Sequence, residues 1–199
     1  MTLSRLSTIS AVTAAALAVG FAAASPGFAQ MKNDAMMSDK PVTVGGAPMF
    51  GSKNIIENAV KSKDHTTLVA AVKAAGLVET LQGAGPFTVF APTNAAFEKL
   101  PNGTVDTLLN PANKSKLSSV LTYHVVAGRL SAKDLMEAAK KDGGKHKLKT
   151  VQGEELTVST EGNKVIVSDS KGNRSTITIQ NVFQSNGVIH VIDSVLLPA

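Results

Sequence analysis

The chain has 199 residues, with 20 basic and 15 acidic side chains, a formal net charge of +5, and neither cysteine nor tryptophan. Without cysteine, the protein has no disulfide bonds, no thiol redox chemistry and no cysteine-based zinc site. The excess of positive charge is small. It favours attraction to anionic surfaces, but nucleic-acid-binding domains are usually far more basic.

The segment 1–29 has the pattern of a secretory signal peptide. Arg5 supplies its positive charge, an apolar run over 8–24 follows, and small residues ending at Ala29 form a cleavage site. The run is short and rich in alanine, whereas a membrane-spanning helix needs about 20 strongly apolar residues. We therefore expect cleavage after Ala29 and a secreted or periplasmic protein that does not span a membrane.

A disordered tail and linker are expected over 30–50, because this segment has no hydrophobic periodicity and contains the flexible stretch Gly45-Gly46-Ala47-Pro48. Methionines gather there, but they have no histidine beside them and no regular spacing, so we expect no copper site. The remaining residues, 51–199, have the length of a single domain.

Apolar residues recur at helical spacing in the first half of this domain. They predict helices near 55–60 and 65–75, the second capped by Asp64, and a short helical turn over 77–81. These elements precede the first segment with the pattern of a strand.

Residues 87–97 combine a strand, a corner and a helix start. The stretch Phe87-Thr88-Val89-Phe90 is aromatic and β-branched, which is typical of a buried strand. Pro92 ends the strand because it has no N–H to donate. Thr93 is expected to cap a helix that runs to 100.

Two further helices are expected in the middle of the chain. Asn110-Pro111 is typical of a helix start and precedes an apolar stripe that ends near 121. The capping box over 131–134 opens another helix, which Gly143-Gly144 ends. The residues 122–126 between these helices predict a short strand.

From residue 146 onward, the hydrophobic period changes from that of helices to that of strands. Alternating strands are expected near 156–158, 165–167 and 176–179, and Asn186-Gly187 is a strong hairpin signal. The closing run over 188–197 is apolar on both faces, so it predicts a central strand that is covered on both sides. Helices first and strands second favour an α+β fold with an antiparallel or mixed sheet.

Two stretches of the chain resemble the signature boxes of the fasciclin domain family. The first runs over 88–97 and the second over 187–198, and the pair Tyr123-His124 that the family also carries lies between them. The signature positions are Thr88, Phe90, Pro92, Thr93, Asn94, Phe97, His190, Ile192, Asp193 and Leu197.

The resemblance covers about 51–198 and is nearest to the small secreted single-domain bacterial members of the family. It implies a β-sheet core, a wedge or sandwich of two sheets, flanked by several short α-helices. It also implies a role in adhesion or extracellular interaction, with no catalysis. The implied partners are an extracellular protein, an anionic polysaccharide or another cell-surface component.

Tyr123 and His124 are a candidate binding pair. As neighbours on the expected strand they would point to opposite faces, so that one packs while the other is displayed. In animal members of the family, the region around this pair is implicated in integrin binding. The alternative is that both belong to the core, with their polar atoms hydrogen-bonded inside it.

A cluster of lysines is the second candidate binding site. It is expected at the C-terminus of a helix and in the loop behind it, where cations also complement the helix dipole. The cluster could bind anionic polysaccharide, lipid head groups or acidic matrix, and the lack of neighbouring aromatic residues argues against single-stranded nucleic acid. Its members are Lys140, Lys141, Lys145, Lys147 and Lys149.

No catalytic, metal or cofactor site is expected. His190 and Asp193 lie three residues apart, so on a strand they would face opposite sides and could not form a relay. His190 is instead expected in the core, and Asp193 is expected to cap backbone N–H groups of the following turn. One alternative function stays open, because some algal proteins that resemble this domain bind carotenoids: a carrier of an apolar small molecule in a groove between helices and sheet.

Overall fold

The computed structural model describes residues 41–199. The predicted signal peptide over 1–29, and the part of the predicted tail over 30–40, lie outside the described residues. None of the helices within residues 41–199 has both the length and the apolar character that crossing a membrane requires.

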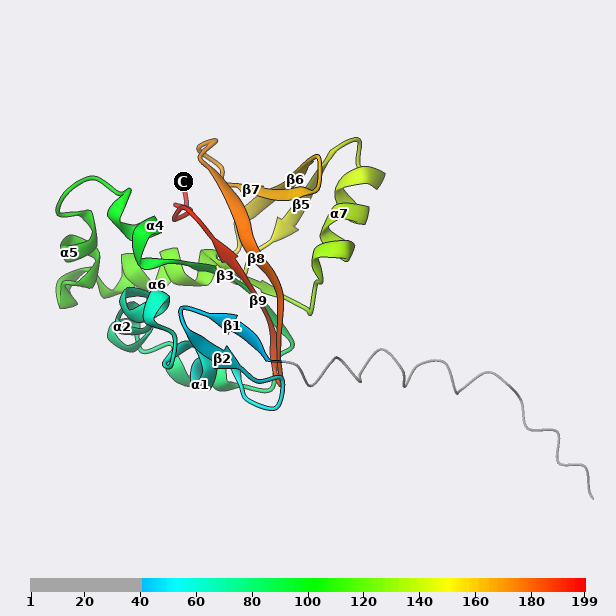
Figure 1. Ribbon diagram of the computed structural model, residues 1–199. Helices are drawn as coiled ribbons and strands as arrows, with labels where there is room; N and C mark the ends of the chain where they lie inside the picture. The colour runs from blue at the N-terminus through cyan, green and yellow to red at the C-terminus, as the bar shows by residue number, and fades with distance from the viewer. Residues whose placement is uncertain (1–40) are drawn as a thin grey trace, which may run out of the picture. The chain divides into compact units, whose positions relative to one another are not determined.

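A mixed sheet of seven strands forms the centre of the domain, in the order β4-β3-β9-β8-β7-β6-β5 (Figure 1). The central strands β3 and β9 run parallel, and all the other neighbours are antiparallel. The strands are β3 (Phe87–Pro92), β4 (Val125–Ala127), β5 (Lys145–Lys149), β6 (Glu155–Glu161), β7 (Lys164–Ser168), β8 (Arg174–Gln184) and β9 (Gly187–Ile192).

The two edges of this sheet approach each other. Val126 of β4 and Thr150, the residue after β5, form an isolated bridge, and the Val151 N–H donates to the Val125 carbonyl over 2.8 Å. The long strand β8 carries irregular pairing between Ile177 and Val182, where extra residues bend it. The seven strands therefore form one continuous sheet that is irregular at β8, where the resemblance implied a wedge or sandwich of two sheets.

Short helices lie on both sides of the sheet (Figure 1). In the figure, α1, α2 and α6 lie on one side of β3 and β9, while α7 lies beside β5 and β6. The helices are α1 (Ile55–Ala59), α2 (Thr66–Ala75), α3 (Val78–Gln82), α4 (Asn94–Glu98), α5 (Thr104–Leu109), α6 (Lys114–Tyr123) and α7 (Ala132–Lys141), with 3₁₀ turns η1 (Lys63–His65) and η2 (Pro111–Asn113).

Alternate side chains of the central strands enter two different hydrophobic cores. Val89 and Ile189 join the core beneath α1, α2, α3 and α6. Phe90 and Ile192 point the other way, into a core that strands β5–β8 and Leu135 of α7 enclose. Every residue of β9 is buried, which confirms the predicted central strand and explains its apolar character on both faces. The prediction of an α+β fold is also confirmed.

Local signals placed several helix starts correctly. The Thr93 hydroxyl accepts the Ala96 N–H over 3.3 Å at the start of α4, and Ser131 and Asp134 form the expected capping box of α7. Asp64, however, does not cap α2, because it lies inside η1. The Asn94 side chain performs that role from α4, accepting the Thr67 N–H over 3.1 Å.

The prediction of a disordered linker is wrong for the residues just before 51. Here β1 (Val42–Val44) and β2 (Ala47–Met49) pair as an antiparallel hairpin around Gly45-Gly46. Both glycines have positive φ, 58° and 75°, which suits the two-residue turns of hairpins. Val44 and Met49 are buried in the core beneath the helices, so the hairpin is part of the packed domain.

The end of the chain also differs from the prediction. The strand β9 ends at Ile192, and the residues after it form no ladder. Their backbone N–H groups donate to side chains instead. The Ser194 N–H donates to the Ser175 hydroxyl. The Leu196 N–H donates to the His124 ring, and the Leu197 N–H donates to the Asp169 carboxylate. These bonds satisfy a backbone that leaves the sheet while it is still covered by other residues.

Candidate functional site

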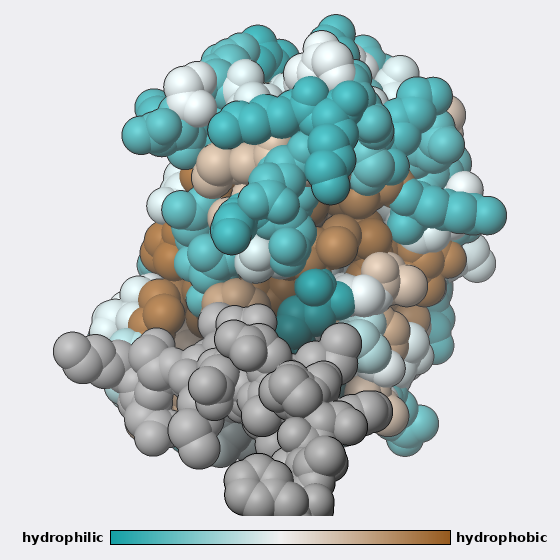
Figure 2. All heavy atoms as spheres, turned by 90° about the vertical axis from the view of Figure 1, so that its right-hand side faces the viewer, coloured by the Kyte–Doolittle hydropathy of each residue, from teal (hydrophilic) through white to brown (hydrophobic). Residues whose placement is uncertain are grey.

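The structure divides the predicted lysine cluster into two groups. Lys140 and Lys141 lie in the last turn of α7, as expected. Lys145, Lys147 and Lys149 lie on strand β5, where a loop was predicted. Figure 2, which views the side that carries α7, shows hydrophilic side chains gathered over its upper part.

The three lysines of β5 point away from α7. Successive side chains of a strand alternate between its faces. Leu148 packs with Leu135 of α7, so Lys145, Lys147 and Lys149 occupy the opposite face, and all three are exposed. Lys141 instead lies with His146 on the face that α7 covers. The two groups of lysines are therefore on different sides of β5.

Strand register shows which residues share a face with these lysines. Lys145 pairs with Ser159, Lys147 with Thr157 and Lys149 with Glu155. The pairing continues across β7 and β8, and we call the resulting surface the outer sheet face. Its members are Lys145, Lys147, Lys149, Glu155, Thr157, Ser159, Glu161, Lys164, Ile166, Ser168, Arg174 and Thr176.

Positive charge dominates the outer sheet face, with five cations against two carboxylates, a net charge of +3. Lys147 pairs with Glu155 over 2.9 Å and Arg174 pairs with Glu161. Within residues 41–199, Lys145, Lys149 and Lys164 form no ion pair. The members on β6–β8 were not among the predicted binding residues, although the alternation of polar and apolar residues over 155–161 was a signal for those on β6.

Tyr123 and His124 do not lie on a strand. Tyr123 is the last residue of α6 and His124 caps that helix, so the predicted strand is wrong for this pair, and the alternative that both belong to the core is the one observed. Both are buried, with 0% and 3% of their surface exposed. At that burial neither side chain can contact a macromolecular partner.

The polar atoms of this pair are bonded inside the fold. The Tyr123 hydroxyl donates to the Glu155 carbonyl over 3.0 Å and accepts the Ser170 N–H over 3.1 Å. Burial raises the pKa of this hydroxyl. The His124 Nδ1–H donates to the Val120 carbonyl over 2.7 Å, and Nε2 accepts the Leu196 N–H over 3.0 Å.

His124 is therefore held as a neutral imidazole with its proton on Nδ1. Burial lowers its pKa to about 4, although the Val120 carbonyl and the Asp169 carboxylate favour the charged form. Both ring nitrogens are engaged in the neutral form. Protonation would remove the acceptor that Nε2 offers to Leu196, so the role of this ring is structural.

His190 and Asp193 do not form a relay. The His190 ring stacks on Phe90 with centroids 5.9 Å apart, and its Nε2–H donates to the Leu130 carbonyl over 2.9 Å. Burial lowers its pKa. The Asp193 side chain accepts the Thr176 N–H, inside strand β8, over 2.9 Å, whereas bonds to the backbone of the following turn were expected. Burial would raise the Asp193 pKa, but this bond and its other donors outweigh burial and lower it.

The other signature residues are also structural. The Thr88 hydroxyl donates to the Gly128 carbonyl over 2.7 Å and accepts the Leu130 N–H over 2.9 Å. Phe97 and Leu197 pack in or against the core beneath the helices. The two boxes meet in the parallel register Thr88↔Val188 and Phe90↔His190.

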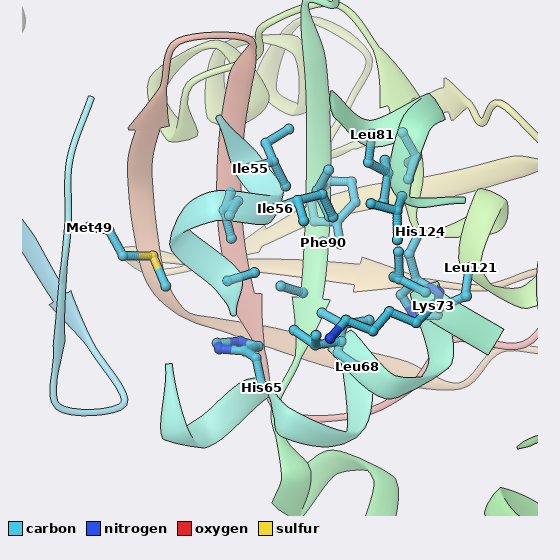
Figure 3. A pocket seen from close by; sticks show the side chains of 18 residues that line it. Met49, Ile55, Ile56, His65, Leu68, Lys73, Leu81, Phe90, Leu121 and His124 are labelled. Atoms are coloured by element: carbon cyan, nitrogen blue, oxygen red, sulfur yellow. The ribbon is translucent and has the colours of Figure 1, made fainter. Parts of the chain in front are cut away.

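A small apolar cavity lies between the helices and the sheet (Figure 3). Ile55 and Ile56 of α1, Leu68 of α2 and Val89 of β3 line it, and Met49 of the hairpin lies at its side. Its volume is about 40 Å³. Pockets for drug-sized ligands have volumes of roughly 300–1,000 Å³, so this space does not support the predicted groove for a carotenoid.

His65 also lines this cavity. Its Nδ1 bonds the Ser62 hydroxyl over 2.9 Å, and its Nε2 has no partner within residues 41–199. Burial lowers the pKa of the ring. Within the same residues, no group of three or more histidine and acidic side chains is placed to hold a metal ion.

Known proteins resemble this chain in sequence over most of its length. The family model of the Fasciclin domain matches residues 63–198. The protein sll1483 of Synechocystis sp. is 42% identical over 193 residues, which cover 97% of this chain and 99% of that protein. Immunogenic protein MPB70 of Mycobacterium bovis is 39% identical over 145 residues, covering 70% of this chain and 66% of MPB70.

Two further similarities come from animals. Transforming growth factor-beta-induced protein ig-h3 of Sus scrofa is 39% identical over 131 residues, which cover 66% of this chain but only 17% of that protein. A solved FAS1 domain pair from the insect cell adhesion molecule Fasciclin I has a TM-score of 0.65 at 18% identity, covering 71% of this chain and 50% of that one. This last similarity concerns the fold alone. With more than half of its length matched by the family model, the chain belongs to the fasciclin domain family.

Proposed function

We propose that this protein is a non-catalytic interaction module that works outside the cytoplasm and adheres to anionic components of a cell surface or extracellular matrix. Its family membership supports this role, and relatives include a protein named cell surface glycolipoprotein MPB83. The predicted signal peptide over 1–29 is the basis for its location. The observation that carries the proposal is the row of exposed lysines on β5.

The proposed partner is an extracellular protein or an anionic polysaccharide. Lysine ammonium groups on long stems attract carboxylate and sulfate groups without needing a preformed pocket. Such attraction is screened by salt, with a Debye length of about 8 Å at physiological ionic strength. Binding by this mechanism is therefore reversible and weakens as salt is added.

Affinity chromatography tests this function. The purified protein is applied to agarose that carries polygalacturonate and, in parallel, to uncharged agarose, and both are eluted with a salt gradient. We expect retention on the charged matrix alone, with elution that depends on ionic strength rather than on pH near neutrality. Equal passage through both matrices at low salt would contradict the proposal.

A further inference from the structure

The lysines of β5 form a straight row with regular spacing. Residues two apart on a strand are about 7 Å apart along it, so Lys145, Lys147 and Lys149 place three ammonium groups over about 14 Å. The side chain of Lys147 is 71% exposed even with its Glu155 pair. A row of this kind fits a linear polymer whose negative charges repeat along an extended chain.

Hydroxyl groups lie directly beside this row. Thr157 and Ser159 of β6 pair with Lys147 and Lys145, and Ser168 of β7 pairs with Thr157. Side chains in paired positions lie about 5 Å apart. The outer sheet face therefore presents a strip of cations and, next to it, a strip of half-buried hydroxyls that can donate and accept hydrogen bonds.

This face exposes almost no apolar side chains and has no aromatic ones, which argues against a membrane or a single-stranded nucleic acid as its partner. Its one apolar residue, Ile166, is 4% exposed, and the exposed large hydrophobic residues within 41–199, Phe50, Val60 and Val151, lie elsewhere. A membrane-surface site would need apolar side chains to insert. A site for single-stranded nucleic acid would need aromatic rings on which bases stack.

We propose that the outer sheet face binds a linear acidic polysaccharide, with Lys145, Lys147 and Lys149 contacting its acidic groups and Thr157 and Ser159 its hydroxyls. This inference rests on the proposed function, since it takes the partner to be anionic. It adds the class of partner and the face that binds it. It also assigns no contact to Lys140 and Lys141, which lie on the other side of β5.

Two triple variants of equal charge test which face binds. One replaces the β5 row, K145Q/K147Q/K149Q. The matched control replaces exposed lysines of α7, K133Q/K140Q/K141Q. Circular dichroism and thermal unfolding verify that both are folded, and affinity for immobilised polygalacturonate is measured at several salt concentrations.

We expect the β5 variant to bind at least about tenfold more weakly than the wild type and to lose most of its salt dependence. The α7 variant should stay within about twofold of the wild type. Equal losses in the two variants would overturn the assignment of the face and leave the proposed function standing, because affinity would then follow total charge. Absence of binding by the wild type would instead overturn the proposed function itself.

A second comparison tests the class of partner. Poly-glutamate carries carboxylates but no sugar hydroxyls, so the wild type should bind polygalacturonate more tightly than poly-glutamate. The variant T157V/S159A keeps the shape and charge of the face and should lose affinity for polygalacturonate alone. Equal affinity of the wild type for both polymers, with no effect of this variant, would overturn the assignment to polysaccharide.

Discussion

Phe90 occupies the point at which the two boxes of the fasciclin signature meet. Its ring is 0% exposed, packs in the core that β5–β8 enclose, and stacks on His190 of the neighbouring strand. The sequence predicted this position well, because an aromatic residue that follows the β-branched residues Thr88 and Val89 is typical of a buried strand. Its contribution is to stability, with no exposed atom available for a partner.

We expect Phe90→Ala to lower the free energy of unfolding by about 3–5 kcal/mol, since the truncation leaves a cavity that rigid neighbours cannot fill. Urea denaturation measures the change. Phe50→Ala is the matched control, because Phe50 is 38% exposed and its loss should cost much less. A Phe90→Ala variant as stable as the wild type, yet unable to bind polygalacturonate, would show that Phe90 belongs to a binding site.

The hydrogen bonds of a buried side-chain amide could not be predicted from the sequence. The sequence indicated a hairpin at Asn186-Gly187 but not the contacts of the Asn186 side chain, which accepts the Ile55 N–H over 3.0 Å and donates to the Leu81 carbonyl over 2.8 Å. Those partners are more than 100 residues away in the chain. A local pattern contains no information about them, because only the complete packing brings them together.

The elements that were wrongly predicted share one cause. Each segment could locally adopt two kinds of secondary structure, and contacts with distant parts of the chain determine which one forms. Three of the residues over 122–126 are β-branched, so the segment suggested a strand, but α6 continues through Tyr123 before the chain enters β4. The segment Lys145–Lys149 looked like a charged loop, yet it pairs along its whole length with β6. Propensity is a weak guide for such short segments.

The hairpin of β1 and β2 was missed for a related reason. Its two glycines were taken as a sign of flexibility, whereas in the structure they make the turn, and each strand has only three residues. Such a short hairpin is not stable alone in water. Val44 and Met49 pack against the helices, and this burial keeps it folded.

We expect Met49→Ala to lower the free energy of unfolding by about 2–5 kcal/mol, because its side chain is 2% exposed and borders the small apolar cavity. Thr43→Ala on the partner strand is the control, since Thr43 is exposed and its replacement should change stability by at most about 0.5 kcal/mol. Chemical denaturation of both variants makes the comparison. Equal, small effects would mean that the hairpin is not part of the cooperative fold.

At the scale of the whole molecule, the polar surface and the buried histidines have separate roles. The lysines that attract a partner lie on the outer sheet face. Three of the four histidines, His65, His124 and His190, are buried at 3% exposure or less. The sequence anticipated His190 in the core, but it could not show that His124 anchors the C-terminal residues, because that contact joins positions 72 residues apart.

The same burial makes the stability of the fold depend on pH. Burial lowers the pKa of all three rings, and that of His124 to about 4. In the unfolded chain a histidine takes up a proton near pH 6.5. As the pH falls from about 6.5 towards 4, the unfolded state therefore binds protons that the folded state does not, and the folded state loses stability.

For His124 alone, the free energy of unfolding should fall by roughly 3 kcal/mol once the pH is below about 4. Roughly 2 kcal/mol of this should already be lost at about pH 5. Urea denaturation of the wild type near pH 7.5 and pH 5 measures the loss, and His65 and His190 should add to it. In His124→Gln the loss should be smaller, because the substituted side chain does not titrate. An equal loss in that variant would contradict the role of His124, as would a His124 ring resonance in the folded wild type that titrates near pH 6.5 in nuclear magnetic resonance.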